Sequence, residues 1–143
     1  MDFIYQDPYP ILKDETQYRK ITSDFVKVEQ LGEREILNVD PKGLELLAQE
    51  AMRDVSFMLR TSHLEKLRAI LDDPEATDND RFVAYNLLQN AVVAIDGELP
   101  SCQDTGTAIV MAKKGENVYT GVDDAEYLSR GIFNTYQEKN LRY

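Results

Sequence analysis

The stretch of the sequence best equipped for chemistry is "LPSCQDTGTAIVM", which contains Cys102, the only cysteine of the chain. An amide, a carboxylate, a hydroxyl and a glycine follow it directly, as Gln103, Asp104, Thr105 and Gly106. A thiolate acts as a nucleophile or a metal ligand. The polar groups beside it are of the kind that hydrogen-bond to a ligating sulfur or to a bound molecule. The stretch is therefore the first candidate for a functional site.

A single cysteine is ordinarily a small buried hydrophobic residue. Three chemical roles are the alternatives for Cys102. A catalytic thiolate needs a histidine partner, and the single histidine, His63, has no spacing relation to the cysteine and is expected at the surface or beside a helix cap. A structural zinc site needs about four ligands, and the chain has no second thiol. An iron–sulfur cluster whose other cysteines lie elsewhere is compatible with these residues but is not selected by them.

Composition limits the class of protein. A chain of 143 residues, 43% hydrophobic and 29% charged, is typical of one soluble globular domain. It contains no apolar run long enough to span a membrane, and its start, "MDFIYQDPYP", lacks the pattern of a secretory signal. One cysteine cannot form an internal disulfide, which fits a reducing compartment. The expected location is the cytoplasm, without a membrane partner.

The net charge of −10 argues against a nucleic-acid partner, because phosphate binding needs a surplus of lysine and arginine on some face. A small anionic ligand would approach against this field, so a local arginine would have to hold it. Arg130 is one candidate, although an arginine on a helix face is more often a solvated charge or an ion-pair partner. Asp123 and Asp124 are expected to cap a helix rather than to form a metal pair.

The residues that surround the candidate site predict helices and hairpins. Residues 1–17, rich in proline and aromatic residues, are expected to form an extended arm that covers a neighbouring domain or subunit. Alternation on both sides of Gly32 predicts a hairpin. A second hairpin is predicted from "TAIVMA" and "NVYT", with Gly115 at a positive φ angle.

Capping residues predict where the helices begin. Asp40 and Pro41 open the first helix, whose apolar face extends to Leu59. A capping box of Ser62 and Glu65 is expected to open the second. The segment "TDND", residues 77–80, opens the third, which ends before Gly97. The apolar residues expected on the buried face of this third helix are Val83, Leu87, Leu88, Ala91, Val92 and Ile95. Asp123 and Asp124 open the last helix, and the result is an α+β fold, mainly helical with short antiparallel hairpins, in a single domain over residues 1–143.

Several motifs together resemble a known family. The segments "LPSCQDTGTAIVMAKKG", "RGIFNTYQEKNLRY", "VSFMLR", "DPEATDND" and "YQDPYPILKDETQYRKIT" are similar to the N-terminal part of the single-chain class I, iron–sulfur-dependent fumarate hydratases. The resemblance covers essentially the whole chain. The cysteine segment alone is also similar to the tartrate dehydratases and the two-subunit fumarases, and the arm and helices favour the single-chain branch.

The resemblance implies a hydro-lyase that interconverts (S)-malate and fumarate with a [4Fe–4S] cluster as Lewis acid. In the family, the cysteine of the "CQDTG" motif is the first of three cluster ligands, so Cys102 inherits that role. Gln103 and Asp104 inherit contacts to the C4 dicarboxylate, and Arg142 of "NLRY" inherits the grip on one of its carboxylates. The other two cysteines and the base belong to the C-terminal part in that family. The complete protein is expected to be a homodimer.

One thiolate cannot hold a cubane cluster, so the 143-residue chain by itself is expected to carry no cluster and to be inactive. The end of the chain at "NLRY" looks like an interrupted element, which suggests a fragment of a longer enzyme. Two alternatives stay open. The first is a related hydro-lyase whose substrate is tartrate or a methylated C4 diacid. The second is a non-catalytic binding or assembly module derived from the enzyme.

Overall fold

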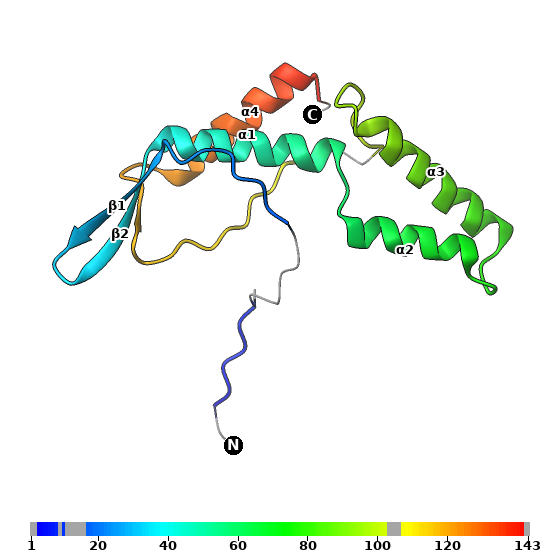
Figure 1. Ribbon diagram of the computed structural model, residues 1–143, viewed down its shortest axis with the longest axis horizontal. Coiled ribbons are helices and arrows are strands. Elements are labelled where there is room, and N and C mark those ends of the chain that lie inside the picture. Colours follow the sequence, from blue (N-terminus) through cyan, green and yellow to red (C-terminus); the bar gives the residue numbers. More distant parts are fainter. Residues whose placement is uncertain (1–2, 9, 11–16, 103–106, 142–143) are drawn as a thin grey trace.

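The computed structural model describes residues 3–8, 10, 17–102 and 107–141. Its elements, in chain order, are β1 (Val26–Leu31), β2 (Arg34–Val39), α1 (Pro41–Phe57), α2 (Thr61–Asp72), α3 (Asp78–Ala94), β3 (Val118–Tyr119) and α4 (Asp124–Lys139). Helix α1 lies at the centre with α4 beside it, while the β1–β2 hairpin projects to one side and α2 with α3 to the other (Figure 1). The predicted α+β class, mainly helical, is confirmed.

The small sheet contains one predicted hairpin and lacks the other. Strands β1 and β2 pair antiparallel, from Val26 opposite Val39 to Leu31 opposite Arg34, and Gly32 takes a φ of 63° at the bend. The hairpin predicted around Gly115 is wrong: residues 107–111 form no strand, and β3 instead pairs parallel with β2. The sheet is therefore mixed. In this part of the chain Gly121, with a φ of 69°, is the glycine that needs the left-handed region.

Helices α1 and α4 form the tightest contact, because a glycine lets their backbones approach. A Cβ atom on Gly131 would lie 2.1 Å from the backbone oxygen of Glu45 and 2.9 Å from Cβ of Ala48. Next to this contact, the buried hydroxyl of Thr135 donates a hydrogen bond of 2.8 Å to the backbone oxygen of Gln49. The α1–α4 pair thus closes on small side chains and a satisfied polar group.

The helix starts are partly as predicted. Asp40 caps α1 by accepting a hydrogen bond from the N–H of Lys42, with Pro41 in the first position. Helix α1 ends at Phe57, two residues before the predicted Leu59. The capping box predicted for Ser62 is wrong. Helix α2 already begins at Thr61 with Arg60 at its N-cap, so the Ser62 side chain lies inside the helix and no side chain caps it.

Helix α3 begins within the predicted segment 77–80, where a capping box forms, and its buried face is much smaller than predicted. Thr77 accepts from the N–H of Asp80, and the Asp80 carboxylate accepts from the N–H of Thr77. Val92 and Ile95, predicted to be buried, are 71% and 66% exposed. Val83 and Leu87 are exposed as well. The physical reason is that α3 packs against α2 along one side, and its remaining apolar side chains face outward.

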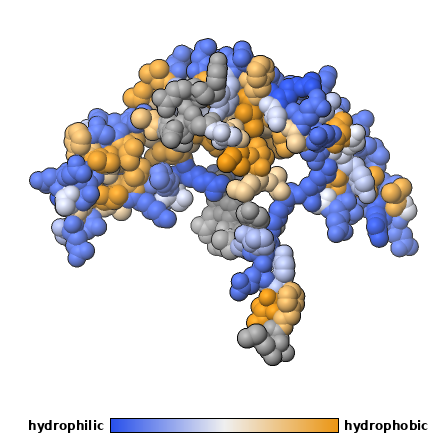
Figure 2. Space-filling model, turned by 180° about the vertical axis from the view of Figure 1, so that it is seen from behind, coloured by the Kyte–Doolittle hydropathy of each residue, from blue (hydrophilic) through white to orange (hydrophobic). Residues whose placement is uncertain are grey.

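The chain exposes far more surface than a compact domain of its size. Its accessible surface is 11825 Å², whereas a folded monomer of 16.4 kDa exposes roughly 7,500 Å². Figure 2 shows hydrophobic residues at the surface of one face, toward its left and right ends and at its centre. The described residues of the arm form neither helix nor strand, and Asp7 ties the arm to Lys113 through an ion pair of 2.6 Å. Among the described residues, no helix is long and apolar enough to cross a bilayer.

Candidate functional site

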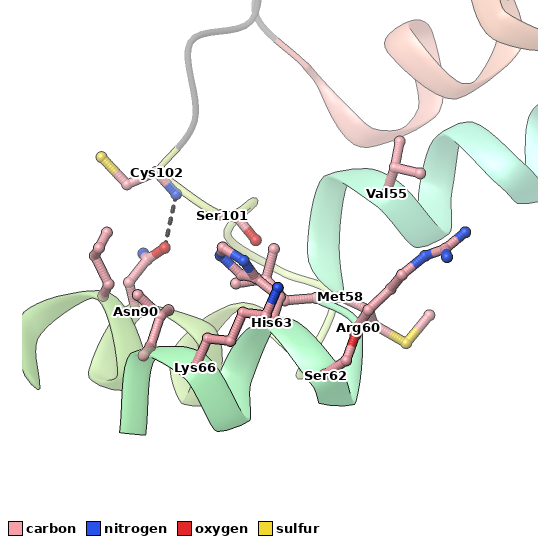
Figure 3. Close-up of a pocket in the computed structure, with 12 residues that line it drawn as sticks. Val55, Met58, Arg60, Ser62, His63, Lys66, Asn90, Ser101 and Cys102 are labelled. Carbon is pink, nitrogen blue, oxygen red and sulfur yellow. Dashed lines mark hydrogen bonds between the residues drawn. The ribbon is translucent and has the colours of Figure 1, made fainter. Parts of the chain in front are cut away.

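Cys102 lies on a short segment that two helices hold by its backbone. Its N–H donates a hydrogen bond of 2.8 Å to Oδ1 of Asn90 on α3. The N–H of Ser101 donates one of 2.8 Å to the backbone oxygen of Ser56, near the end of α1. The thiol is free and exposed. The structure thus fixes the backbone at the cysteine and leaves the sulfur accessible (Figure 3).

A pocket of about 540 Å³ opens beside this segment, where the end of α1, the start of α2 and the side of α3 meet. Its lining residues are Val55, Met58, Leu59, Arg60, Ser62, His63, Lys66, Leu67, Leu87, Asn90, Ser101 and Cys102. Basic side chains and apolar side chains share this lining, and none of the described residues that form it is acidic. The pocket is therefore an electropositive place on an acidic chain.

The structure brings His63 to the same pocket as Cys102, a relation that the sequence analysis missed. The segment over residues 58–60 drops below the end of α1 and places the first turn of α2 near the cysteine segment (Figures 1 and 3). No spacing in the sequence signals this, because it depends on the angle between two helices. Figure 3 shows the sulfur of Cys102 directed away from the imidazole, so the two residues do not form a nucleophile and base pair.

Three of the predicted site residues, Gln103, Asp104 and Arg142, lie outside the described residues. What the structure shows is the chain on either side of them. Cys102 is held by Asn90, as above. Leu141, directly before the arginine, is 4% exposed and its N–H bonds to the backbone oxygen of Tyr136, closing the end of α4.

The remaining candidates have structural roles. Arg130 forms an ion pair of 2.7 Å with Glu126 one turn away on α4, as expected for a charge on a helix face. Asp123 caps α4 by accepting from the N–H of Ala125. Asp124 accepts from Nζ of Lys114 at 2.6 Å and from the hydroxyl of Thr120, and these bonds hold the pKa of the Asp124 carboxyl below its usual value.

Among the described residues, Cys102 could serve as one ligand of an iron–sulfur cluster. No group of three histidine, cysteine or acidic residues close enough to share a metal ion occurs among the described residues. An exposed thiol on a backbone that two hydrogen bonds hold is nevertheless what a single cluster ligand requires, since the sulfur must reach iron without rearranging the chain. Cys102 thus fits the part of one ligand among several.

Comparison with known proteins shows a matching family model and several similar sequences. The model of a family described as fumarate hydratase (Fumerase) matches residues 45–143. The chain is 54% identical, over 99% of its length, to the anaerobic class I fumarate hydratase of Escherichia coli (strain K12), of which it covers 26%. It is 51% identical over 99% of its length to the aerobic class I fumarate hydratase of Salmonella typhimurium, of which it covers 24%. Over 90% of its length it is 50% identical to the mitochondrial fumarate hydratase 1 of Leishmania major, again covering 24%. The chain spans about a quarter of the length of these relatives.

Proposed function

This chain belongs to the fumarate hydratase family, and we propose that it forms the part of a class I enzyme that supplies one cluster ligand and three substrate contacts. The reaction is the reversible addition of water to fumarate, giving (S)-malate. The observation that supports this most directly is the free, exposed thiol of Cys102 on a held backbone, inside the segment that the family matches.

Each proposed contact suits a small dianion. Arg142 binds one carboxylate through its guanidinium fork, which matches both oxygens at once. Gln103 and Asp104 orient the substrate beside the thiolate of Cys102. A [4Fe–4S] cluster ligated in part by Cys102 would supply a Lewis acid for the C2 hydroxyl. We assign no proton-abstracting base to the chain.

The proposal requires polypeptide beyond these 143 residues. Relatives are about four times as long, and their remaining length would supply the other two cluster cysteines and the base. The surface of the chain, well above that of a compact domain, supports burial against such a partner. The chain alone would then hold no cluster and be inactive. We also propose that the complete protein is a cytoplasmic homodimer, with the aromatic arm covering a neighbouring domain or subunit.

A chimera tests the proposal. The matching quarter of the anaerobic Escherichia coli relative is replaced by this chain, the cluster is reconstituted anaerobically, and dehydration of (S)-malate is measured. The matched control is the same host with the corresponding quarter of the aerobic Escherichia coli relative, which is 51% identical to this chain. We expect turnover within about ten-fold of that control. A folded chimera that binds a cluster but does not turn over malate, while the control does, would contradict the proposal.

The same preparation separates the alternative substrates. Tartrate and a methylated C4 diacid are assayed beside malate under identical conditions. A chimera that prefers either acid over malate by kcat/KM, when the control prefers malate, would move the proposal to that hydro-lyase. A chimera that binds no cluster in a host that otherwise assembles one would favour the non-catalytic module.

A further inference from the structure

The pocket beside Cys102 has a polar atom that the fold leaves unsatisfied. Ser101 is 6% exposed, and its Oγ has no hydrogen-bond partner in the described part of the chain. A buried hydroxyl without a partner costs free energy, and native structures rarely retain one without a reason. Ser101 lines the pocket, and Figure 3 shows its hydroxyl directed into it. The atom is therefore placed to bond to something that enters.

The basic side chains of the pocket form no ion pair in the part of the chain that the structure describes. Arg19, Arg53, Arg81 and Lys114 form ion pairs elsewhere. Arg60 and Lys66 have no ion pair with any residue that the structure describes, although the chain as a whole is strongly acidic. Together with His63 they follow one another at intervals of three residues at the start of α2, and all three line the pocket.

The start of α2 adds to this positive potential. No described side chain caps the helix, so its first N–H groups contribute the positive end of the helix dipole without an acceptor among these residues. Helix N-termini of this kind attract anions. A polar hydroxyl, unpaired cations and an uncapped helix start all point to a negatively charged ligand.

The shape of the lining selects the class of anion. Figure 3 shows His63 and Lys66 near Ser101, whereas Arg60 extends on the other side, by Val55 and Met58. Val55 and Leu67 are among the apolar side chains of the same lining. The volume of about 540 Å³ exceeds what inorganic phosphate needs and is within the range of pockets for small organic ligands.

We propose that this pocket binds a free organic polycarboxylate. One carboxylate bonds to the hydroxyl of Ser101 and to Lys66, with His63 as a further donor, and a second carboxylate pairs with Arg60. The carbon chain lies on the apolar lining. The inference goes beyond the proposed function, because the residues that carry it, Ser101, Arg60 and Lys66, are not among the proposed substrate contacts.

The test is calorimetric titration of the 143-residue chain with citrate and succinate, compared with inorganic phosphate and with neutral succinamide. We expect millimolar or tighter binding of citrate, weaker binding of phosphate by about five-fold or more, and no binding of succinamide. Phosphate that binds as well as citrate would overturn the assignment to an organic acid. Absence of citrate binding at low ionic strength would overturn the site itself.

Variants locate the binding. R60Q/K66Q should weaken citrate binding at least about ten-fold. The matched control is R34Q/K27Q, which removes the same charges from unpaired residues of the β1–β2 hairpin, away from the pocket, and should change affinity less than two-fold. Ser101→Ala should weaken binding about five-fold. Equal losses in both double variants would mean nonspecific attraction and would overturn the proposal.

Two further measurements separate this site from its surroundings. The iron content of the chimera is measured beside the citrate affinity of R60Q/K66Q, so failure of the proposed enzymatic function, seen in the iron, and failure of this site, seen in citrate binding, give different results. The chimera described above should also bind citrate in a manner that R60Q/K66Q weakens. Citrate binding by the isolated chain but not by the chimera would mean that polypeptide fills the pocket, and would contradict a site for a free ligand.

Discussion

The side chain of Asn90 and the backbone of Cys102 are joined by a hydrogen bond of 2.8 Å, in which the cysteine N–H donates to Oδ1 of the amide. This bond links the last turns of α3 to the segment that contains the only thiol. With the Ser101 N–H bonded to the backbone oxygen of Ser56 on α1, it makes the position of the thiol depend on both α1 and α3.

Asn90→Ala should loosen the backbone at Cys102. A hydrogen bond of this kind contributes about 0.5–1.5 kcal/mol, so exchange of the Cys102 amide proton should accelerate by roughly five-fold in hydrogen exchange measured by NMR. Asn86→Ala is the matched control, because Asn86 lies one turn earlier on α3 and donates to the backbone of its own helix. Unchanged exchange at Cys102 in Asn90→Ala would show that the bond does not hold the segment.

Gly131→Ala should separate α1 from α4. The added Cβ would lie 2.1 Å from the backbone oxygen of Glu45, and backbone atoms cannot move aside cheaply. We expect a loss of about 2–3 kcal/mol in the free energy of unfolding, measured by urea denaturation. Gly115→Ala is the control, since its Cβ would meet only Val118 at 3.6 Å. Equal stability of the two variants would contradict the packing described.

Thr77→Ala should destabilise α3, because Thr77 and Asp80 satisfy each other's backbone N–H groups at the helix start. The expected loss is about 1 kcal/mol in the free energy of unfolding. Ser62→Ala should cost much less, as Ser62 lies inside α2 and caps nothing. If Ser62→Ala were the more damaging of the two, the helix start at Thr61 would be wrong.

Asp124 should make the free energy of unfolding depend on pH in the acidic range. Its pKa is lowered in the folded chain by hydrogen bonds from Lys114 and Thr120, so its contribution is complete above the ordinary value of 3.8 and disappears as the pH falls through the lowered pKa. The difference in unfolding free energy between wild type and Asp124→Asn should therefore be largest near neutral pH and shrink in acid. Asp96→Asn, at an exposed carboxylate, is the control. A difference that grows in acid would have the wrong sign.

Local signals in the sequence predicted the cap at Asp40, a cap within residues 77–80 and the bend at Gly32, because each depends on neighbouring residues alone. The parallel pairing of β3 with β2 was missed, since it joins Val118 to Leu37 across most of the chain. A strand of two residues also leaves almost no periodic pattern to detect.

Burial was overestimated for a related reason. Apolar residues at helical spacing on α3 predicted a buried face, yet Val92 is 71% exposed. Periodicity shows that a face is apolar and says nothing of which polypeptide covers it. In the candidate site, the cysteine was found from its neighbours in sequence. The pocket with His63 and Ser101 was not, because three separate helices and a turn create it.

Iron and sulfide analysis of the reconstituted chimera, with Cys102 and with Cys102→Ser, tests the central claim most directly. If Cys102 supplies a cluster ligand, the cysteine form should retain about four irons per chain, and the serine form should lose most of its iron together with its malate turnover. Both proteins must show the same circular dichroism, so that loss of the fold is not mistaken for loss of a ligand. A serine form that keeps its iron and its rate would contradict the account.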